Sequence, residues 1–420
     1  MRYIERQGYS SIVEAKQHKH DVYSLNLRGI GYEEFPEDIQ LFDGLVSLDI
    51  SRNNIKELPY NIDSLKLLET LDISFNKITR INCSFENLLF LETLKLSGNK
   101  IEFLPGNFFK MRYLYNLSLN VCRLTDIPSE IKSLKRLRTL DLSQNKINRI
   151  PEELFSLKKL EKLNLNDNEI YHLPKINSNM SNLKSIDLGR NSLNKISRKF
   201  GNFYNLESLS LSYNHLSSLP DEIVNLKKLK YLDLDNNNFE YFPSQISELT
   251  SLNSIYLSNN KIKSIPSNIR YLENLQILDL QSNELENIPS ELKYIRKLRF
   301  LLLNSNNFKV FPIELSNFKN LSSVSLNNNK IEFLPNDLEN LYTISTLDLG
   351  NNSLNFLPIQ IKYLCNIKRI NLNKNNLSSL PNEIFNLNYL TDLDISENNF
   401  TLKELEKIKN NINPNCKLTT

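Results

Sequence analysis

Carboxylates at regular intervals are the groups in this sequence with the clearest potential for chemistry. A row of carboxylates can support general acid/base catalysis, or it can attract the Lys and Arg side chains of a partner. Eight Asp residues are separated by multiples of 23 residues, namely Asp49, Asp72, Asp141, Asp187, Asp233, Asp279, Asp348 and Asp394. Catalysis also requires a pocket and supporting groups, which this spacing does not suggest. Two interpretations stay open: the row keeps a protein face soluble, or it attracts a basic partner. A nucleic acid is disfavoured because its backbone is anionic.

The other reactive residue types form no recognisable catalytic or metal-binding motif. His18 and His20 could touch a metal, but they have no further ligands nearby, so we favour a solvated role. A phosphate-binding glycine motif, HExxH, CxxC and a nucleophile elbow are all missing from the sequence. We therefore predict a non-enzymatic protein without a metal ion or a cofactor.

The Asp spacing belongs to a period that runs through most of the chain. Starting at Val22, an apolar residue recurs every 23 residues as far as Leu390, which gives 17 repeats without insertion or deletion. Position nine of the repeat is Asn in 15 of the 17 copies, with Ile30 and Cys122 as the departures. Fourteen of the 15 prolines occupy position fifteen. This repeat explains why Asn makes up about 15% of the chain.

The pattern LxxLxLxxNxLxxLPxxIxxLxx resembles the leucine-rich repeat family, in its typical 23-residue class. The resemblance covers roughly residues 22–400. The "LPxxIxxLxxL" half is most similar to intracellular Ras-pathway scaffolds and Ras-suppressor proteins. The resemblance implies an α/β fold: a right-handed leucine-rich-repeat solenoid (horseshoe) with a parallel concave sheet and a helical or irregular convex side.

The spacing of the repeat is also physically reasonable without the resemblance. The "LxLxx" portion predicts a short strand, and stacked copies would form a parallel sheet with strands about 4.8 Å apart. The turn that follows each strand would leave buried backbone groups in need of partners. An Asn amide offers two donors and an acceptor, so a column of Asn side chains can bridge successive turns.

A repeat of this kind needs a cap at each end. Residues 1–21 are predicted to form an N-terminal cap, with Tyr3, Ile4, Ile12, Val13 and Ala15 at partly helical spacing. Residues 22–400 are the solenoid. Residues 401–420 are predicted to form a C-terminal cap helix, with Leu402, Leu405 and Ile408 facing inward, and a short tail.

Composition points to a cytoplasmic protein. The net charge is only +3 at pH 7, so composition implies no strong field for an anionic partner. Four scattered cysteines, Cys83, Cys122, Cys365 and Cys416, suggest free thiols in a reducing compartment. The first 20 residues lack the apolar core of a signal peptide, and no run approaches the roughly 18 apolar residues of a membrane span. We predict no membrane insertion.

One segment, LRFLLLNSNNFKVFP (298–312), departs from the expected alternation of apolar and polar residues. Leu301 is a core position, whereas Phe300 and Leu302 occupy positions three and five, which should face solvent on the concave side. Neighbouring repeats add aromatic and aliphatic residues there, and Asp187, Asp233, Asp235, Asp279 and Arg299 are expected at the rim. The predicted partner-binding set is Tyr213, Tyr231, Asp233, Tyr256, Ile277, Asp279, Arg299, Phe300 and Leu302. The alternative is that these side chains only pack across strands.

These features predict an interaction scaffold that binds a protein partner through its concave face. The resemblance suggests signalling as the setting, with a small GTPase or a signalling enzyme as the partner, and we expect a monomer. Two alternatives stay open: a substrate-recognition or regulatory subunit of an enzyme complex, and an exported surface protein for adhesion or ligand binding.

Overall fold

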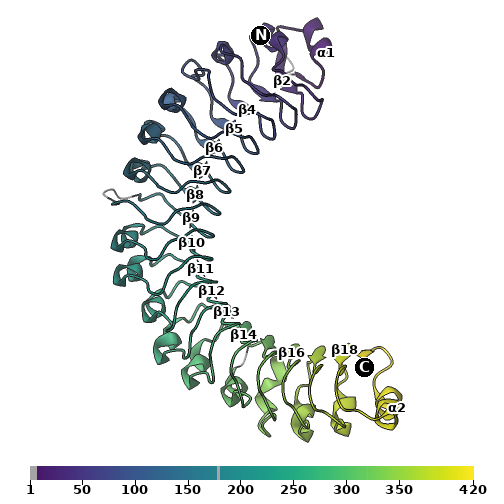
Figure 1. The fold of residues 1–420 in the computed structure, drawn as a ribbon. Helices are drawn as coiled ribbons and strands as arrows, with labels where there is room; N and C mark the ends of the chain where they lie inside the picture. Colours follow the sequence, from purple (N-terminus) through teal and green to yellow (C-terminus); the bar gives the residue numbers. More distant parts are fainter. Residues whose placement is uncertain (1–6, 177–179, 319) are drawn as a thin grey trace, which may run out of the picture. The chain divides into compact units, whose positions relative to one another are not determined.

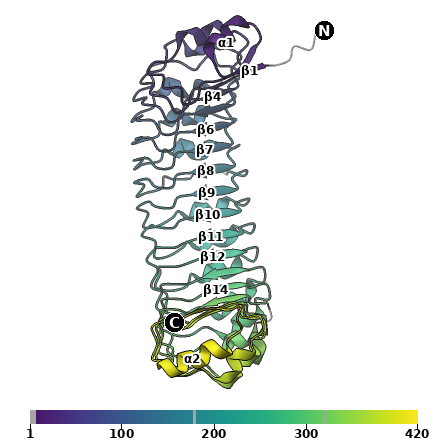
Figure 2. The same ribbon diagram turned by 90° about the vertical axis from the view of Figure 1, so that its right-hand side faces the viewer.

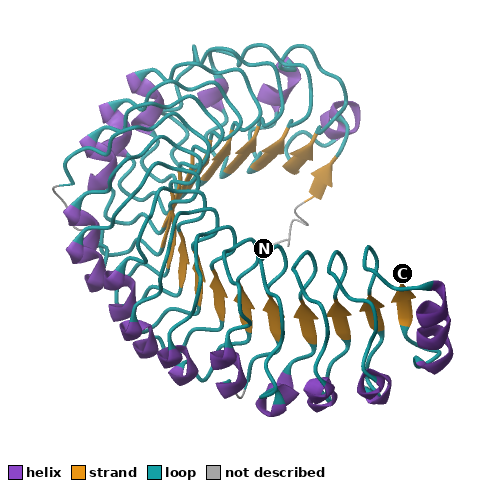
Figure 3. Ribbon diagram, turned by 60° about the horizontal axis from the view of Figure 1, so that its bottom comes forward, coloured by secondary structure: helices purple, strands orange, loops and turns teal. Residues whose placement is uncertain are grey.

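The structure is a computed structural model that describes residues 7–176, 180–318 and 320–420. The chain divides into two compact units, Met1–Asn214 and His215–Thr420. In both units, short strands run along one side and short helices lie on the other (Figures 1 and 3). Strands β2 to β18 supply one strand for each of the 17 predicted repeats. The predicted solenoid of 23-residue repeats is therefore confirmed.

The strands of each unit form a parallel sheet in which each strand pairs with the strand one repeat further on (Figure 2). Those of the first unit are β1 (Gln7–Tyr9), β2 (Val22–Asn26), β3 (Ser47–Asp49), β4 (Thr70–Asp72), β5 (Thr93–Lys95), β6 (Asn116–Ser118), β7 (Thr139–Asp141), β8 (Lys162–Asn164), β9 (Ser185–Asp187) and β10 (Ser208–Ser210). Those of the second unit are β11 (Tyr231–Asp233), β12 (Ser254–Tyr256), β13 (Ile277–Asp279), β14 (Phe300–Leu302), β15 (Ser323–Ser325), β16 (Thr346–Asp348), β17 (Arg369–Asn371), β18 (Asp392–Asp394) and β19 (Lys417–Thr419).

Short 3-10 helices cover the side away from the sheet, and most of them follow the proline at position fifteen. Pro128, for example, has an extended conformation with φ of −62° directly before a helix, which suits a residue with a fixed φ and no N–H. The 3-10 helices are η1 (Glu37–Leu41), η2 (Ile62–Ser64), η3 (Gly106–Lys110), η4 (Ser129–Ser133), η5 (Glu152–Ser156), η6 (Arg198–Asn202), η7 (Asp221–Asn225), η8 (Ser244–Glu248), η9 (Ser267–Tyr271), η10 (Ser290–Tyr294), η11 (Ile313–Asn317), η12 (Glu339–Thr343), η13 (Ile359–Tyr363) and η14 (Asn382–Asn386).

The alternation of side chains along each strand separates core from surface. In β3, Leu48 is fully buried, whereas Ser47 and Asp49 are half-buried on the sheet face. The same pattern occurs in β14, where Leu301 is buried and Phe300 is exposed. Positions three and five of each repeat therefore form the sheet face, as predicted.

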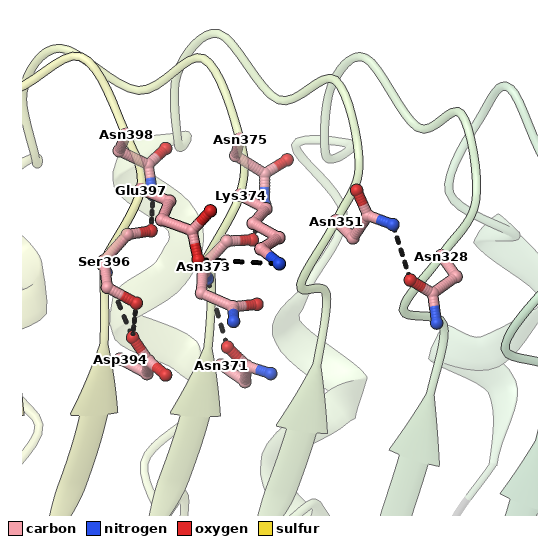
Figure 4. Close-up of polar contacts among 10 residues, drawn as sticks. All are labelled: Asn328, Asn351, Asn371, Asn373, Lys374, Asn375, Asp394, Ser396, Glu397 and Asn398. Atoms are coloured by element: carbon pink, nitrogen blue, oxygen red, sulfur yellow. Dashed lines mark hydrogen bonds and ion pairs between the residues drawn. The ribbon is translucent and has the colours of Figure 1, made fainter.

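The Asn column at position nine forms the expected ladder. Asn191 donates from Nδ2 to the carbonyl oxygens of Leu188 and Leu165, both at 3.0 Å, and its Oδ1 accepts from the N–H of Ile170 at 3.0 Å. Asn375 and Asn398 repeat the arrangement near the C-terminus. Figure 4 labels both side chains and shows the additional bond from Asn398 to the carbonyl oxygen of Ser396. Each amide thus bridges two successive turns. It supplies hydrogen-bond partners to backbone N–H and C=O groups that would otherwise be buried without one.

Cys122 occupies position nine in place of Asn, and its thiol makes fewer of the backbone hydrogen bonds than an Asn amide makes. Its Sγ lies 3.5 Å from the carbonyl oxygen of Leu96 and 3.7 Å from that of Asn120, and burial raises the pKa of the thiol to about 11. We expect Cys122→Asn to raise the free energy of unfolding by about 1 kcal/mol, because an amide would also accept from the N–H of Ile101. Urea denaturation measures this change, and Cys122→Ser, whose hydroxyl is shorter than an amide, is the control. An Asn variant no more stable than the Ser variant would contradict the prediction.

A second Asn column, which the sequence did not reveal as a ladder, occupies position twenty-three. Each of these side chains donates from Nδ2 to the carbonyl oxygen of position twenty-two in the preceding repeat. They are Asn182, Asn205, Asn274, Asn320 and Asn366. Asn side chains therefore form two separate columns of backbone contacts.

Position eight has a left-handed backbone conformation in every repeat, with φ between +50° and +71°. Gly and Asn adopt this conformation most readily, and the column includes Gly29 and Asn351. It also includes Phe75, Val121 and Tyr213, for which the conformation is unfavourable. Neighbouring side chains interact along this column: Asn351 donates to Asn328 at 2.6 Å, and Lys374 pairs with Glu397 at 3.5 Å (Figure 4).

The N-terminal cap differs from the prediction in detail. Its helix, α1, is restricted to Ile12–Gln17, and strand β1 precedes it and pairs with β2. Ile12 and Ala15 are buried as expected, but Val13 is 74% exposed because it lies on the outer face of the short helix. Tyr3 and Ile4 lie outside the described residues.

The C-terminal cap contains the predicted helix, α2 (Leu402–Asn411), which begins where Thr401 accepts from the N–H of Glu404 at 3.2 Å. Ile408 is buried and Leu405 is half-buried, but Leu402 is 82% exposed. The prediction for Leu402 was wrong because it lies in the first turn, away from the core. The residues expected to form a tail include strand β19, which pairs with β18 and extends the sheet.

Candidate functional site

Strands β11–β14 bring most of the predicted binding residues together on the sheet face of the second unit. We call this set the β11–β14 surface; it consists of Tyr231, Asp233, Tyr256, Ile277, Asp279, Phe300 and Leu302. Arg299 directly precedes β14 and is exposed. The surface is built by strand positions three and five, whose side chains share one face of the sheet.

Tyr213 belongs to the first unit and occupies a different kind of position. It lies in the left-handed column with φ of +52°, and its ring lies 4.1 Å from the Arg190 guanidinium. The ring is 44% exposed. Tyr213 thus makes a cation–π contact within its own unit. It is not a member of the β11–β14 surface.

The strand pairing arranges the surface as two rows of directly opposed residues. The first row is Tyr231, Ser254, Ile277 and Phe300, and the second is Asp233, Tyr256, Asp279 and Leu302. The rings of Tyr231 and Tyr256 lie 5.3 Å apart with a tilt of 44°, a separation at which aromatic rings attract one another. In the second row, one aromatic ring therefore lies between two carboxylates.

The apolar members of this surface are only partly covered. Phe300 is 44% exposed and Tyr231 is 37% exposed, whereas Tyr256, Ile277 and Leu302 are half-buried. Exposed apolar side chains on adjacent strands, with charged residues beside them, are typical of interaction sites. The hydrophobic run at 300–303 thus contains both core and surface residues.

Asp279 does not lie at the rim of the surface, contrary to the sequence-based expectation. It is only 4% exposed, because Tyr256 and Leu302 stand on either side of it in the same row. Its two carboxylate oxygens accept from the backbone N–H and the side-chain Nε2 of Gln281, both at 3.1 Å. Burial raises the pKa of this carboxyl above its usual value, against the effect of those hydrogen bonds.

Asp235, which the sequence suggested only as a rim residue, has the most perturbed carboxyl in this region. Burial raises its pKa to about 7, and the nearby carboxylates of Asp233 and Asp279 add to the shift. Its Oδ1 accepts from the N–H of Ser258 at 2.5 Å, which acts in the opposite direction. A sequence signal was present: position seven is uncharged in every other repeat except the first, which has Arg28.

The regular Asp column has a local structural role that the sequence did not reveal. In each of the eight repeats, the Asp Oδ1 accepts from the backbone N–H two residues later and closes a turn at the end of the strand. Asp394 and Ser396 show this contact at 3.0 Å (Figure 4). Turn formation therefore accounts for the column as a whole, including Asp233 and Asp279 beside Tyr256.

Two further properties of the described residues limit the chemistry available. Within 7–176, 180–318 and 320–420, no three His, Cys, Asp or Glu side chains are placed to hold a metal ion. Over the same ranges, no helix is long and apolar enough to cross a membrane. Burial raises the pKa of the Cys83 thiol to about 12, which makes it a poor nucleophile.

Family models match the chain over much of its length. A model described as a leucine-rich repeat region matches residues 106–199. Two models described as leucine rich repeats match residues 181–239 and 250–308, and residues 67–88 and 90–111. No curated protein matches the chain.

Several solved structures are also similar to this chain in fold and sequence. A leucine-rich-repeat protein of Leptospira interrogans is 31% identical, with a TM-score of 0.86, and the match covers 99% of this chain and 100% of the other. The plant peptide hormone receptor RGFR1, in complex with RGF2, is 26% identical with a TM-score of 0.57, over 94% of this chain and 77% of the receptor chain. The ectodomain of the Arabidopsis thaliana receptor kinase GASSHO1/SCHENGEN3, in complex with CASPARIAN STRIP INTEGRITY FACTOR 2, is 25% identical with a TM-score of 0.61. That match covers 93% of this chain and 54% of the receptor chain.

Proposed function

Because the chain belongs to the leucine-rich repeat family, whose fold is typical of protein–protein interaction modules, we propose that it is a scaffold that binds a protein partner through the β11–β14 surface. The observation that carries this proposal is the partly exposed apolar cluster around Phe300 and Leu302, at positions that are polar in most repeats. Apolar side chains at exposed strand positions contribute little to the core but are suitable anchors for a partner.

The similar receptor structures support protein binding in general terms. RGFR1 and GASSHO1/SCHENGEN3 were both solved in complex with another molecule. A shared fold does not determine the partner, which must therefore be inferred from the site in this chain. A role in signalling, with a small GTPase or a signalling enzyme as the partner, rests on the resemblance of the repeat consensus and is part of the proposal.

We also propose a cytoplasmic location for the scaffold. The four cysteines are free thiols in the structure, and Cys365 is exposed, an arrangement suited to a reducing compartment. Fractionation of cells that produce the protein, with antibody detection in each fraction, tests this location. Recovery at the surface of intact cells would favour the alternative of an exported ligand-binding protein.

The double substitution Phe300→Asp and Leu302→Asp tests the proposed surface. We expect the affinity for a purified partner to fall at least about tenfold, because two apolar anchors are lost and charged side chains take their place in an apolar contact. Partners would first be captured by wild-type protein and identified, and affinity would then be measured by calorimetry.

The matched control is Asn116→Asp with Ser118→Asp, which places the same charges at positions three and five of β6 in the first unit. This control should bind as tightly as the wild type. If the Phe300 and Leu302 variant is folded, as judged by circular dichroism, and retains full affinity, the β11–β14 surface is not the binding site.

A further inference from the structure

The edge of the first unit at which strands β4–β8 begin carries a distinctive set of exposed side chains. Positions twenty-two and twenty-three of repeats two to six are residues 66–67, 89–90, 112–113, 135–136 and 158–159. We call this set the repeat 2–6 edge. Six of its ten residues are basic, four are apolar or aromatic and none is acidic, and all ten are exposed.

The framework of the repeat does not require these side chains. From Asn182 onward, the Asn side chains at position twenty-three donate to a carbonyl oxygen of the preceding repeat. In repeats two to six, all of which lie within the described range 7–176, this position is apolar, aromatic or basic, and no side chain there makes that bond. Exposed apolar side chains at a position that elsewhere serves the fold are available to a partner.

The apolar side chains lie at one end of the edge, in repeats two to four. Leu67 is 45% exposed, Leu89 is 54% exposed and Phe90 is 55% exposed. Neighbouring repeats stack about 4.8 Å apart, so side chains at the same two positions form one continuous patch. Leucine offers neither charge for a phosphate nor an aromatic face for a base. This half of the edge therefore favours a protein partner over a nucleic acid.

The basic side chains lie at the other end of the edge, in repeats four to six. Arg112, Tyr113, Lys135 and Arg136 line a hollow of about 580 Å³. The Arg136 guanidinium lies 4.3 Å from the centroid of the Tyr113 ring, a cation–π contact that restricts its motion. Within the described part of the chain, Arg112, Lys135 and Lys158 make no ion pair. Their charges are available to an anionic group of a partner.

Two carboxylates of this region are already paired with other basic residues. Glu86 also lines the hollow, but it pairs with Lys110 at 2.7 Å. Glu161 pairs with Arg138 at 3.6 Å and with Lys184 at 3.0 Å. Neither carboxylate is paired with a cation of the repeat 2–6 edge, so an acidic side chain from outside can complement these cations.

We propose that the repeat 2–6 edge is a second docking surface, which binds an extended protein segment with apolar residues at one end and acidic residues at the other. Apolar side chains of the segment contact Leu89 and Phe90. Its Asp or Glu side chains pair with Arg112 and Lys135. Five repeats span about 19 Å, which about six residues in an extended conformation cover.

Charge also sets the direction in which the segment lies. Glu69 and Glu92 are exposed and follow Leu67 and Phe90 by two residues. These carboxylates repel acidic groups from the apolar half of the edge, so the acidic end of the segment lies over repeats four to six. This surface belongs to the first unit and is formed by other repeats than the β11–β14 surface, so the inference goes beyond the proposed function and does not rest on it.

A random peptide display library, selected on the full-length wild-type chain, supplies the probe. Among the retained peptides, we expect a class that combines Asp or Glu with Leu, Ile or Phe and that still binds the variant with Phe300→Asp and Leu302→Asp. One peptide of this class would be synthesised with a fluorescent label, together with a version in which Asn and Gln replace Asp and Glu. Affinities would be measured by anisotropy.

Charge reversal on the edge should weaken binding of the labelled peptide. We expect Arg112→Glu combined with Lys135→Glu to lower the affinity about tenfold and to reduce its dependence on salt concentration. The version with Asn and Gln should bind the wild type about tenfold more weakly than the acidic peptide. Leu89→Ala combined with Phe90→Ala should also lower the affinity about tenfold, because it removes the apolar anchors.

Lys227→Glu combined with Arg296→Glu is the matched control. It makes the same change of charge at position twenty-two of two repeats in the second unit, and the affinity for the labelled peptide should not change. Circular dichroism of each variant verifies that the chain is folded.

The outcomes separate this inference from the proposed function. An empty selection, or retained peptides that all bind the Arg112 and Lys135 variant as tightly as the wild type, would overturn the repeat 2–6 edge. Loss of every retained peptide in the Phe300 and Leu302 variant would also overturn it, and would support the β11–β14 surface. A labelled oligonucleotide that binds more tightly than every peptide, and that loses binding in the Arg112 and Lys135 variant, would make the edge a nucleic-acid site and contradict the inference.

Discussion

Replacement of Asn191 by Ala should lower the free energy of unfolding by about 4 kcal/mol, which is the largest effect that we expect from a single side chain. Its amide bridges two turns: Nδ2 donates to the carbonyl oxygens of Leu165 and Leu188, and Oδ1 accepts from the N–H of Ile170. Asn191 is itself buried, at 8% exposure. Alanine leaves these backbone groups without a partner in a region that water does not reach, and each such group costs about 1–3 kcal/mol.

Asn182→Ala is the matched control for this prediction because it removes an Asn from the other column. Asn182 makes a bond of 2.7 Å to the carbonyl oxygen of Lys158 at an exposed position, where water can replace the amide. We expect Asn182→Ala to lower the free energy of unfolding by about 1 kcal/mol or less. Urea denaturation followed by circular dichroism compares the two variants. If both variants lose the same free energy of unfolding, the buried Asn column contributes no more to stability than the exposed one, and the prediction is wrong.

The framework of the fold could be predicted from the sequence because its determinants repeat. Each Asn at position nine and each Pro at position fifteen has the same neighbours in every copy, so 17 copies reveal a pattern that one copy would conceal. The strands, the ladder and the exposure of Phe300 follow directly from this register. The family assignment is confirmed, whereas the resemblance to Ras-pathway scaffolds is still a prediction.

Features that depend on contacts between repeats were harder to predict. The ladder at position twenty-three is interrupted by other residues, such as Ser251, whose hydroxyl donates to the equivalent carbonyl oxygen of Lys227. The left-handed backbone at position eight is obscured because Phe75, Val121 and Tyr213 occupy it along with Gly and Asn. The caps were predicted only in outline, since they have no second copy for comparison.

In the candidate site, too, features fixed by the repeat could be predicted, whereas features set by individual neighbouring side chains could not. Positions three and five could be assigned to the sheet face, so the apolar members of the β11–β14 surface were found. The burial of Asp279 could not be predicted, because it results from the size of its neighbours Tyr256 and Leu302 in the adjacent strands. Likewise, the raised pKa of Asp235 results mainly from burial, with added repulsion from Asp233 of its own repeat and from Asp279 two strands away.

The perturbed carboxyl of Asp235 leads to a second large prediction, in which Asp235→Asn stabilises the protein at pH 8. The pKa is about 7 in the folded state, compared with about 3.9 for an unperturbed Asp in the unfolded chain. Between these values the folded protein holds a proton that the unfolded chain has lost. Stability therefore falls as the pH rises from 4 to 7 and stays lower above pH 7. Asparagine resembles the protonated form, and its Oδ1 can still accept from the N–H of Ser258.

We expect Asp235→Asn to unfold with a free energy about 2–3 kcal/mol higher than the wild type at pH 8, a figure reduced to allow for partial exposure of the side chain. At pH 4 the two proteins should differ by less than about 1 kcal/mol, since the carboxyl is protonated in the folded state and about half protonated in the unfolded state. Urea titrations at both pH values give this difference. Ser97→Asn introduces the same amide at position seven, where the serine hydroxyl bonds to the hydroxyl of Ser118 and not to a carboxylate; it should shift stability equally at both pH values. An advantage of Asp235→Asn that is the same at pH 4 and pH 8 would mean that packing, not charge, is responsible.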